Sequence, residues 1–460
     1  MKIPLSPPAI STVLNKLEPS ELADAMQQIT PLPCGKYLHW DELRHRTPPA
    51  TLSHEAWWAS VFFARSGQMH ELPLLDKSGK PFKFSMPTPV QIGLHHIDRD
   101  AAGQIRSTSD HVAPDDSKRY LMSSLIEEAI TSSQLEGAAT TRQVAADMLR
   151  QGRKPRNHSE TMIFNNYRAM EMLRSMKGSP LTPSFVLELH RTLTEGTLDN
   201  PLDCGRLRTD DDINVVDNRD QQVLHIPPAH QELPSRLERL CAFGNADETS
   251  EPFVHPVVRA ILLHFMIGYD HPFVDGNGRT ARALYYWSIA RSGYWLMEYT
   301  SISHILKEAP SQYVRAYLHT ETDNNDTTYF VLHQIETIRK AINALHDYLS
   351  RKSKEQHETQ KLLTASPKLR TRFNHRQQAI ITHALRGSGE SYRVDAHQRT
   401  HNVSYQTARN DLLDLKDLGL LEVHKKGNAY IFFPPADLRE RLANLSGGHT
   451  ITSQILLGGG

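Results

Sequence analysis

Hydrophobic residues recur at helical spacing through the middle of the chain. In residues 120–131, for example, Leu121, Leu125, Ile126 and Ile130 fall on one face of a helix. The same periodicity predicts further helices over residues 160–176, 183–196, 234–243, 254–269, 279–292, 311–320 and 327–363. We therefore predict a mainly α fold for this part of the chain.

One stretch interrupts the helical pattern. Residues 213–216 and 223–226 are short apolar runs on either side of a polar turn, and Pro227 and Pro228 follow the second run. This pattern is typical of a β-hairpin. Because two strands alone do not make a stable sheet, we expect the hairpin to lie over another part of the protein as a flap.

The two ends of the chain have patterns of their own. Residues 1–110 are rich in proline, and we predict helices at 10–26 and 54–64 and a turn between extended segments within 72–87. Residues 366–435 read as a helix, a short helix, a third helix and two strand-like runs, the order of a winged helix-turn-helix (α/β) module. The predicted organisation is an accessory region (1–110), a helical domain (117–325), a linker helix (326–365), the winged helix-turn-helix (366–435) and a tail (436–460).

Composition narrows the class of protein. Lys plus Arg and Asp plus Glu each number 52, so the whole chain has no net field that would attract nucleic acid. No apolar run approaches the ~18 residues of a membrane span, and no signal-type segment follows Met1. We expect a cytoplasmic protein with no membrane partner. The widely spaced Cys34, Cys204 and Cys241 predict neither a disulfide framework nor a zinc site.

The densest chemistry lies in residues 271–282, which read His-Pro-Phe-Val-Asp-Gly-Asn-Gly-Arg-Thr-Ala-Arg. A helix arrives before this stretch and another leaves after it. The backbone N–H groups of Gly276, Asn277, Gly278 and Arg279 should therefore lie at a helix N-terminus, where they can bind an anion. Asp-Gly and Asn-Gly are also common hairpin turns, but the helical flanks argue against a hairpin here.

The side chains of the same stretch suggest phosphate chemistry. Asp275 is a hard oxygen ligand suited to Mg²⁺ beside a phosphate. Arg279 and Arg282, three positions apart on a helix, could clamp phosphate oxygens. His271 could accept a proton from a hydroxyl at neutral pH. An EF-hand is excluded because Tyr286 stands where that loop needs a carboxylate, and the sequence has no P-loop.

With nine fixed positions intact, residues 271–282 resemble the signature of Fic domain proteins. The resemblance extends over about residues 117–320, where Asn166-Tyr167, His190-Arg191, Gly205 and Arg208 fall at matching places. It implies a helical bundle with a β-hairpin flap. It also implies transfer of AMP from ATP to a Ser, Thr or Tyr hydroxyl of a protein, which could be the chain itself, with release of pyrophosphate.

The resemblance assigns roles to individual residues. His271 would deprotonate the target hydroxyl, Asp275 would hold Mg²⁺, residues 276–279 would cradle the phosphates, and Arg282 would bind the γ-phosphate. Gly278 favours AMP transfer, because members that phosphorylate resemble a variant with lysine there. Tyr313 would contact the nucleobase or simply pack. The flap residues that would register the target by adding a strand are Val215, Val223, Leu224, His225 and Ile226.

A second motif predicts a brake on this activity. Ser132, Glu136 and Gly137 resemble the inhibitory motif of Fic proteins, Ser/Thr-x-x-x-Glu-Gly/Asn. If Glu136 pairs with Arg282, it occupies the arginine meant for the γ-phosphate and repels that phosphate. Alternatively, Glu136 is an ordinary surface charge, or it orients a water that removes AMP from modified targets. Another nucleotide donor also stays open.

The rival hypothesis is a DNA-binding regulator. In the winged-helix interpretation, the residues at the exposed start of the recognition helix are Ser404, Tyr405, Gln406, Arg409 and Asn410, and Lys425 and Lys426 lie at the wing tip. Asp411, Asp414 and Asp417 interrupt this basic surface. The module could equally dock a protein or join two copies of the chain into a homodimer.

Overall fold

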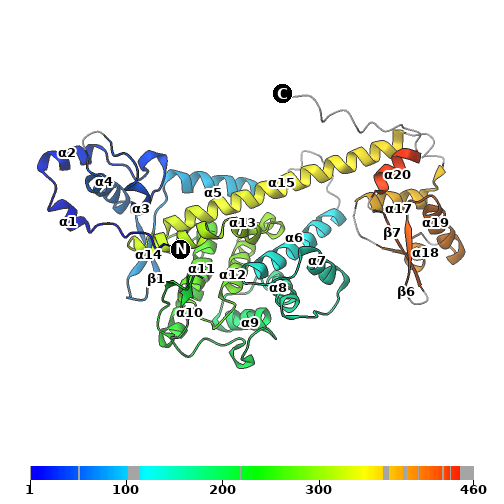
Figure 1. The fold of residues 1–460 in the computed structure, drawn as a ribbon, viewed down its shortest axis with the longest axis horizontal. Coiled ribbons are helices and arrows are strands. Elements are labelled where there is room, and N and C mark those ends of the chain that lie inside the picture. The colour runs from blue at the N-terminus through cyan, green and yellow to red at the C-terminus, as the bar shows by residue number, and fades with distance from the viewer. Residues whose placement is uncertain are drawn as a thin grey trace. The chain divides into compact units, whose positions relative to one another are not determined.

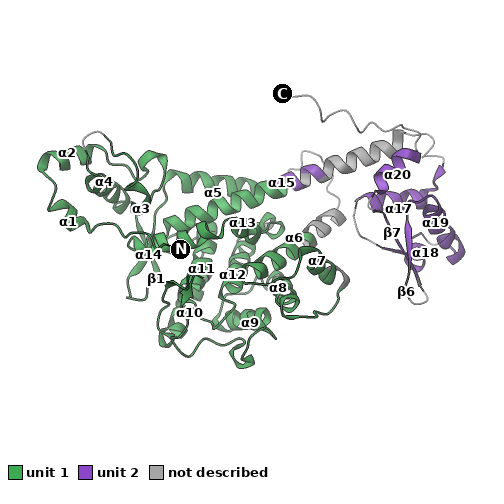
Figure 2. Ribbon diagram, in the orientation of Figure 1, with its two compact units in different colours: residues 1–345 green, residues 346–460 purple. Residues whose placement is uncertain are grey.

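A computed structural model describes residues 2–49, 52–101, 114–217, 219–365, 372–386, 391–401, 403–426, 429–435 and 437–445. The chain divides into two compact units, Met1–Leu345 and His346–Gly460 (Figure 2). None of the helices in the described ranges has the length and apolar character of a membrane span.

Unit 1 begins with short helices and a two-stranded sheet: α1 Ile10–Leu14, α2 Pro19–Gln27, α3 Trp40–Leu43, α4 His54–Ser66, β1 His70–Leu75, β2 Pro81–Phe84 and α5 Thr88–Ala101 (Figure 1). The single helix predicted at residues 10–26 is wrong. Pro19 starts a separate helix there, because proline fits a first helical turn and lacks the N–H that an interior position needs. Ser53 caps α4 as predicted, since its side chain accepts a hydrogen bond from the Ala56 N–H.

The helical part of unit 1 comprises α6 Pro114–Leu135, α7 Arg142–Gln151, α8 His158–Ser175, α9 Pro183–Thr194, α10 Leu233–Asn245, α11 Pro256–Asp270, α12 Asn277–Arg291, α13 Ile302–Glu308, α14 Pro310–Thr322 and the start of α15 Thr328–Ala365. At the centre α11 packs against α12 (Figure 1). Every residue of α11 from Val257 to Ile267 is buried, and so is every residue of α12 from Arg279 to Ile289. Helices that are buried all round form the interior of a domain, so these two supply a rigid base for the loop between them.

The expected flap is present as β3 Val215–Val216 and β4 Val223–His225, which pair antiparallel with Val215 opposite His225. The region predicted as an accessory domain does not stand apart, since it belongs to the same compact unit as the helices. The Phe82 ring of β2, for instance, packs edge-on against Phe265 of α11 at 5.2 Å.

Unit 2 contains α17 His375–Arg386, β5 Tyr392–Arg393, α18 Val394–His401, α19 Tyr405–Asp417, β6 Glu422–Lys426, β7 Ala429–Phe433 and α20 Leu438–Leu445. The strands form one antiparallel sheet in the order β5-β7-β6. The predicted helices and strands are all found, with β5 and α20 in addition. The tail predicted from residue 436 is therefore wrong at its start, because Leu438 and Leu442 of α20 are buried in the core of this unit.

Candidate active site

The loop between α11 and α12 is held in an unusual backbone conformation. His271 ends α11 with φ 44° and ψ 56°, in the left-handed region that non-glycine residues rarely adopt. Gly276, with φ 84°, precedes α12. Arg208 fixes the start of the loop, because its Nε donates to the His271 carbonyl (3.0 Å) and its backbone N–H donates to the Pro272 carbonyl (2.9 Å). These two contacts explain why an arginine at position 208 belongs to the sequence pattern that accompanies the loop.

The middle of the loop is fixed by Asn277. Its side-chain oxygen accepts from the Phe273 N–H (2.9 Å), and its amide nitrogen donates to the Phe273 carbonyl (2.8 Å). The buried Phe273 ring stacks on the His190 imidazole at 3.7 Å. Because His190 Nδ1 accepts from the Gly205 N–H (3.0 Å), its Nε2 carries the proton and donates to the Asp275 carbonyl (2.8 Å). Burial lowers the pKa of His190 to about 4, which keeps this ring neutral.

The His271 ring is held by its own helix in a form that can accept a proton. Its Nδ1 lies 3.2 Å from the Gly268 carbonyl, which can only accept, so Nδ1 carries the proton and Nε2 has the free lone pair. Burial lowers the pKa of His271 below 6.5, with the Arg208 and His225 charges acting in the same direction and the Gly268 carbonyl and Glu136 acting against it. The ring is therefore neutral, and able to accept a proton, at neutral pH.

This lowered pKa sets the expected pH dependence. The reactive form is the neutral ring, which predominates above the pKa, so kcat/KM should decline at acid pH with a midpoint below 6.5, the usual pKa of histidine. The pH profile of kcat/KM for a Glu136→Gly variant measures this acid limb. A decline with its midpoint at or above 6.5 would contradict the assignment of His271 as the base.

A carboxylate already occupies the predicted anion site. The N–H groups of Asn277, Gly278 and Arg279 open α12 and have no partner within the helix. A Cβ at Gly278 would overlap the Glu136 carboxylate, so that carboxylate lies directly against the first turn of α12. Its Oε1 also accepts from Arg282 Nη2 at 2.8 Å. Glu136 thus lies where an incoming phosphate would meet both the helix N-terminus and Arg282.

The other residues of the predicted inhibitory motif adjoin the same arginine. Ser132 lies in the last turn of α6 and accepts from Arg282 twice, through its hydroxyl (2.9 Å, from Nε) and its carbonyl (3.0 Å, from Nη2). Gly137, with φ 93°, turns the chain away after Glu136. Helix α6 extends through Leu135. That is four residues beyond the predicted end of the helix and is what brings Ser132 and Glu136 onto Arg282.

Arg279 differs from its prediction. Its side chain is fully buried, with Nη1 donating to the Leu193 carbonyl (2.9 Å) and Nη2 to Asp275 (3.3 Å). The paired phosphate clamp expected from Arg279 and Arg282 is therefore not formed. The Arg279 guanidinium instead stabilises the loop from the protein interior. The part of Arg279 available to the anion site is its backbone N–H, in the first turn of α12.

The donor set around Asp275 fits one magnesium ion brought in with phosphates. The carboxylate is 54% exposed beside the anion site. Within the described residues no three His, Cys, Asp or Glu side chains gather to hold a metal by themselves. Mg²⁺ in phosphate sites is commonly held by one or two carboxylates, the substrate phosphates and water, so Asp275 alone suffices as the protein ligand.

The flap residues divide into two groups. Val223 and Ile226 are exposed, while Val215 and Leu224 are partly buried, so these four remain available to a target. His225 was predicted with them but is only 7% exposed and turns inward. It contacts α11 and α14 instead.

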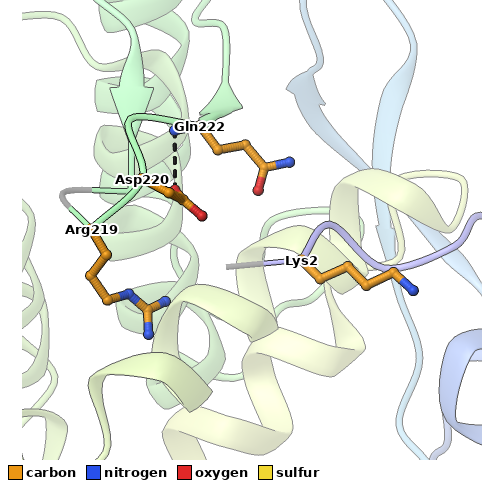
Figure 3. A pocket seen from close by; sticks show the side chains of 4 residues that line it. All are labelled: Lys2, Arg219, Asp220 and Gln222. Atoms are coloured by element: carbon orange, nitrogen blue, oxygen red, sulfur yellow. Dashed lines mark hydrogen bonds between the residues drawn. The ribbon is translucent and has the colours of Figure 1, made fainter.

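The flap turn borders an open surface hollow of about 520 Å³, lined by Lys2, Arg219, Asp220 and Gln222 (Figure 3). The Gln222 N–H donates to the Asp220 carboxylate (3.2 Å) within this turn. No residue of the loop between α11 and α12 lines this hollow, so the hollow is separate from the anion site.

Tyr313 packs instead of facing an open nucleobase site. Its hydroxyl is 2.8 Å from His264 Nε2 and 3.4 Å from the Tyr317 hydroxyl. These contacts agree with the packing alternative for this partly buried residue.

Comparison with known proteins agrees with the geometry. Residues 180–289 match the family described as Fic/DOC. This segment is therefore similar to the domain of that family. A Nematostella vectensis protein named protein adenylyltransferase Fic is 28% identical over 186 residues, which make up 38% of this chain and 40% of that protein. A Drosophila melanogaster protein of the same name is 36% identical over 116 residues, which make up 25% of this chain and 21% of that protein. The matched segments thus span less than half of these relatives.

Among solved structures, the chain is similar to a Fic family protein from Desulfovibrio desulfuricans G20. The TM-score is 0.49 and the identity 17%, and the match covers 76% of this chain and 97% of that one. A Fic domain containing signaling protein from Bacteroides thetaiotaomicron gives a TM-score of 0.44 at 22% identity, covering 56% of this chain and 97% of that one.

Proposed function

We propose that the Fic domain transfers AMP from ATP to a Ser, Thr or Tyr hydroxyl of a protein and releases pyrophosphate. The observation that carries this proposal is the convergence of three groups on one loop: the free Nε2 of His271, the N-terminus of α12 and the Arg282 guanidinium. The names of the matched relatives support AMP as the transferred group.

The proposed reaction uses these groups in turn. His271 Nε2 takes the proton from the target hydroxyl as its oxygen forms a bond to the α-phosphorus. The bond from the α-phosphorus to the bridging oxygen of the β-phosphate breaks, and pyrophosphate leaves with that electron pair. Bound at Asp275 and the phosphates, Mg²⁺ would neutralise charge on the leaving group. The N–H groups at the start of α12 cradle the phosphates, and Arg282 binds the γ-phosphate once Glu136 has moved away.

In this proposal, Glu136 restrains the enzyme. Its carboxylate repels an incoming phosphate and occupies the Arg282 nitrogen that would bind it. Release of Glu136 would open the anion site without moving Arg282 Nε, which stays bound to Ser132.

Labelled ATP tests the reaction and its donor. In the Glu136→Gly variant, label from the α-phosphorus should become covalently attached to protein, whereas label from the γ-phosphorus should not. Attachment of the γ-label would show phosphorylation instead. Excess UTP, GTP or CDP-choline should leave the α-label incorporation unchanged, and strong competition by one of them would identify a different donor.

We also propose DNA binding as a second candidate function. One of the three aspartates that would interrupt a basic surface on the recognition helix, Asp411, is buried in unit 2. Asp411 is 3% exposed, and its carboxylate is bound by Arg376 (2.7 Å), so it does not place a negative charge on the outer face of α19. Tyr405, Gln406 and Asn410 are exposed at the start of that helix. Asp414 and Asp417 remain exposed, and the side chains of Lys425 and Lys426 lie outside the described part of the structure.

The salt dependence of DNA binding tests this second proposal. The full chain should shift duplex DNA in a gel, and the logarithm of the binding constant should fall linearly with the logarithm of salt concentration. If Arg409 contacts a phosphate, Arg409→Ala should reduce that slope by about 1. No shift at low salt, or a slope that Arg409→Ala leaves unchanged together with the affinity, would argue against this surface.

A further inference from the structure

His225, the flap residue that turns inward, makes two short contacts. Its Nε2 lies 2.7 Å from the Tyr269 carbonyl of α11, and its Nδ1 lies 2.7 Å from the Glu321 carboxylate of α14. The side chains of His225 and Glu321 are 6% and 19% exposed. The catalytic loop itself uses neither residue.

The partners of His225 define its protons. The Tyr269 carbonyl can only accept, so Nε2 must donate. With Nε2 protonated, a neutral ring would turn the Nδ1 lone pair toward the carboxylate, and two lone pairs at 2.7 Å repel. A proton must therefore lie between Nδ1 and Glu321, which makes this contact a short hydrogen bond between two largely buried side chains.

This pair lies at the C-terminal end of α11, next to His271. Tyr269 is the second-last residue of α11 and comes two positions before His271. The last carbonyls of a helix have no partner within it, and a cation near them is favourable. The His225 side chain caps the helix end from which His271 projects.

A second contact ties the same elements together. The Lys77 N–H, in the turn between β1 and β2, donates to the Tyr269 hydroxyl (3.1 Å), and Lys77 Nζ donates to the Ile226 carbonyl of the flap (3.1 Å). The flap is thus connected to Tyr269 twice: directly, through the Tyr269 carbonyl, and through Lys77, which binds the Tyr269 hydroxyl.

We propose that His225 and Glu321 form a buried latch that fastens the flap to the end of α11 and positions His271 for proton transfer. Both are positioning residues, and the inference rests on the proposed AMP transfer. The latch couples the surface that would receive the target to the histidine that would deprotonate it.

The effect of the latch on His271 can be measured through the pKa of His271, because neighbouring charged groups act on that pKa. The charged groups that act on the His271 ring are His225 of the flap, Arg208 of the segment before the flap and Glu136 after α6. The Asp270 carboxylate beside it is paired with Arg236 at 2.7 Å. Since His225 acts electrostatically to lower the pKa of His271, its replacement by glutamine should raise that pKa.

Histidine NMR titration tests the latch without relying on activity. In the full chain, the His271 signal is the one lost in His271→Ala. We expect its pKa to rise in His225→Gln and to stay nearer the wild-type value in His225→Lys, which carries a positive charge. The control is His95→Gln, a change of an exposed residue of α5, which should leave the pKa of His271 unchanged. An unchanged His271 pKa in a folded His225→Gln protein would overturn the latch.

AMP transfer supplies the second readout. In the Glu136→Gly background, His225→Gln should lower kcat by roughly 10- to 100-fold, as expected for a misplaced catalytic group, with little change in the KM for ATP. If His225→Gln does not fold, the isosteric Glu321→Gln should lower kcat in the same way, and an unchanged kcat there would refute the latch. An NMR shift in a protein that transfers no AMP would support the latch and reject the proposed function.

Discussion

Replacing Glu136 by glycine is expected to raise the rate of AMP transfer by roughly 10- to 100-fold. The change removes the 2.8 Å bond to Arg282 Nη2 and the carboxylate against Gly278. A hydrogen bond between charged groups is worth about 1.5–3 kcal/mol, which corresponds to roughly that factor in the population of the open site. The rest of the site should persist, because Asn277 and His190 fix the loop through contacts that do not involve Glu136.

Incorporation of AMP from α-labelled ATP measures this effect, with Glu248→Gly in an exposed loop as the matched control. Equal labelling of wild type and Glu136→Gly would reject the brake. The alternative role, in which Glu136 orients a water that removes AMP, makes a separate prediction. In that case Glu136→Gly would lose the release of AMP from an already modified protein, while wild type would retain it.

Replacing His271 by alanine in the Glu136→Gly background should lower kcat by about 10²- to 10⁴-fold, the usual contribution of a general base. His190, the histidine of α9 that contacts the loop, has no free lone pair, since its Nδ1 accepts from Gly205 and its Nε2 donates to Asp275. The affinity for ATP should change little, because the proposed phosphate ligands are the start of α12 and Arg282.

The matched control is His95→Ala, which removes an exposed histidine of α5. A His271→Ala variant that keeps its kcat within a factor of about 10 of its parent would fall outside the range for a general base and would show that another group takes the proton.

The loop and its place at a helix N-terminus could be predicted from sequence because they depend on local residues. Two glycines, an aspartate and a histidine within eight positions, set between apolar helical runs, define a helix N-terminus with a base beside it. The approach of Glu136 to Arg282 spans 146 positions and came from the resemblance of a short motif, not from any pattern of spacing.

Side-chain directions could not be predicted in the same way. Arg279 and Arg282 share a helix face by spacing, but the Leu193 carbonyl and Asp275 draw the Arg279 guanidinium into the interior. The inward turn of His225 likewise depends on a carboxylate 96 positions away.

Some missed elements did leave a signal in the sequence. Helix α7 begins after Thr141, whose side chain caps it, and ends at Gly152 with φ 62°. By contrast, β5 has two residues and α20 has eight, too few for a hydrophobic period to stand out.

The most direct test is the intact mass of the Glu136→Gly protein after incubation with ATP and Mg²⁺. We predict that the protein, or a target protein added to it, gains the mass of one AMP, and that Glu136→Gly combined with His271→Ala gains none. If neither the protein nor added targets gain AMP, or if the double variant gains as much as Glu136→Gly, the proposal that this site transfers AMP with His271 as its base is contradicted.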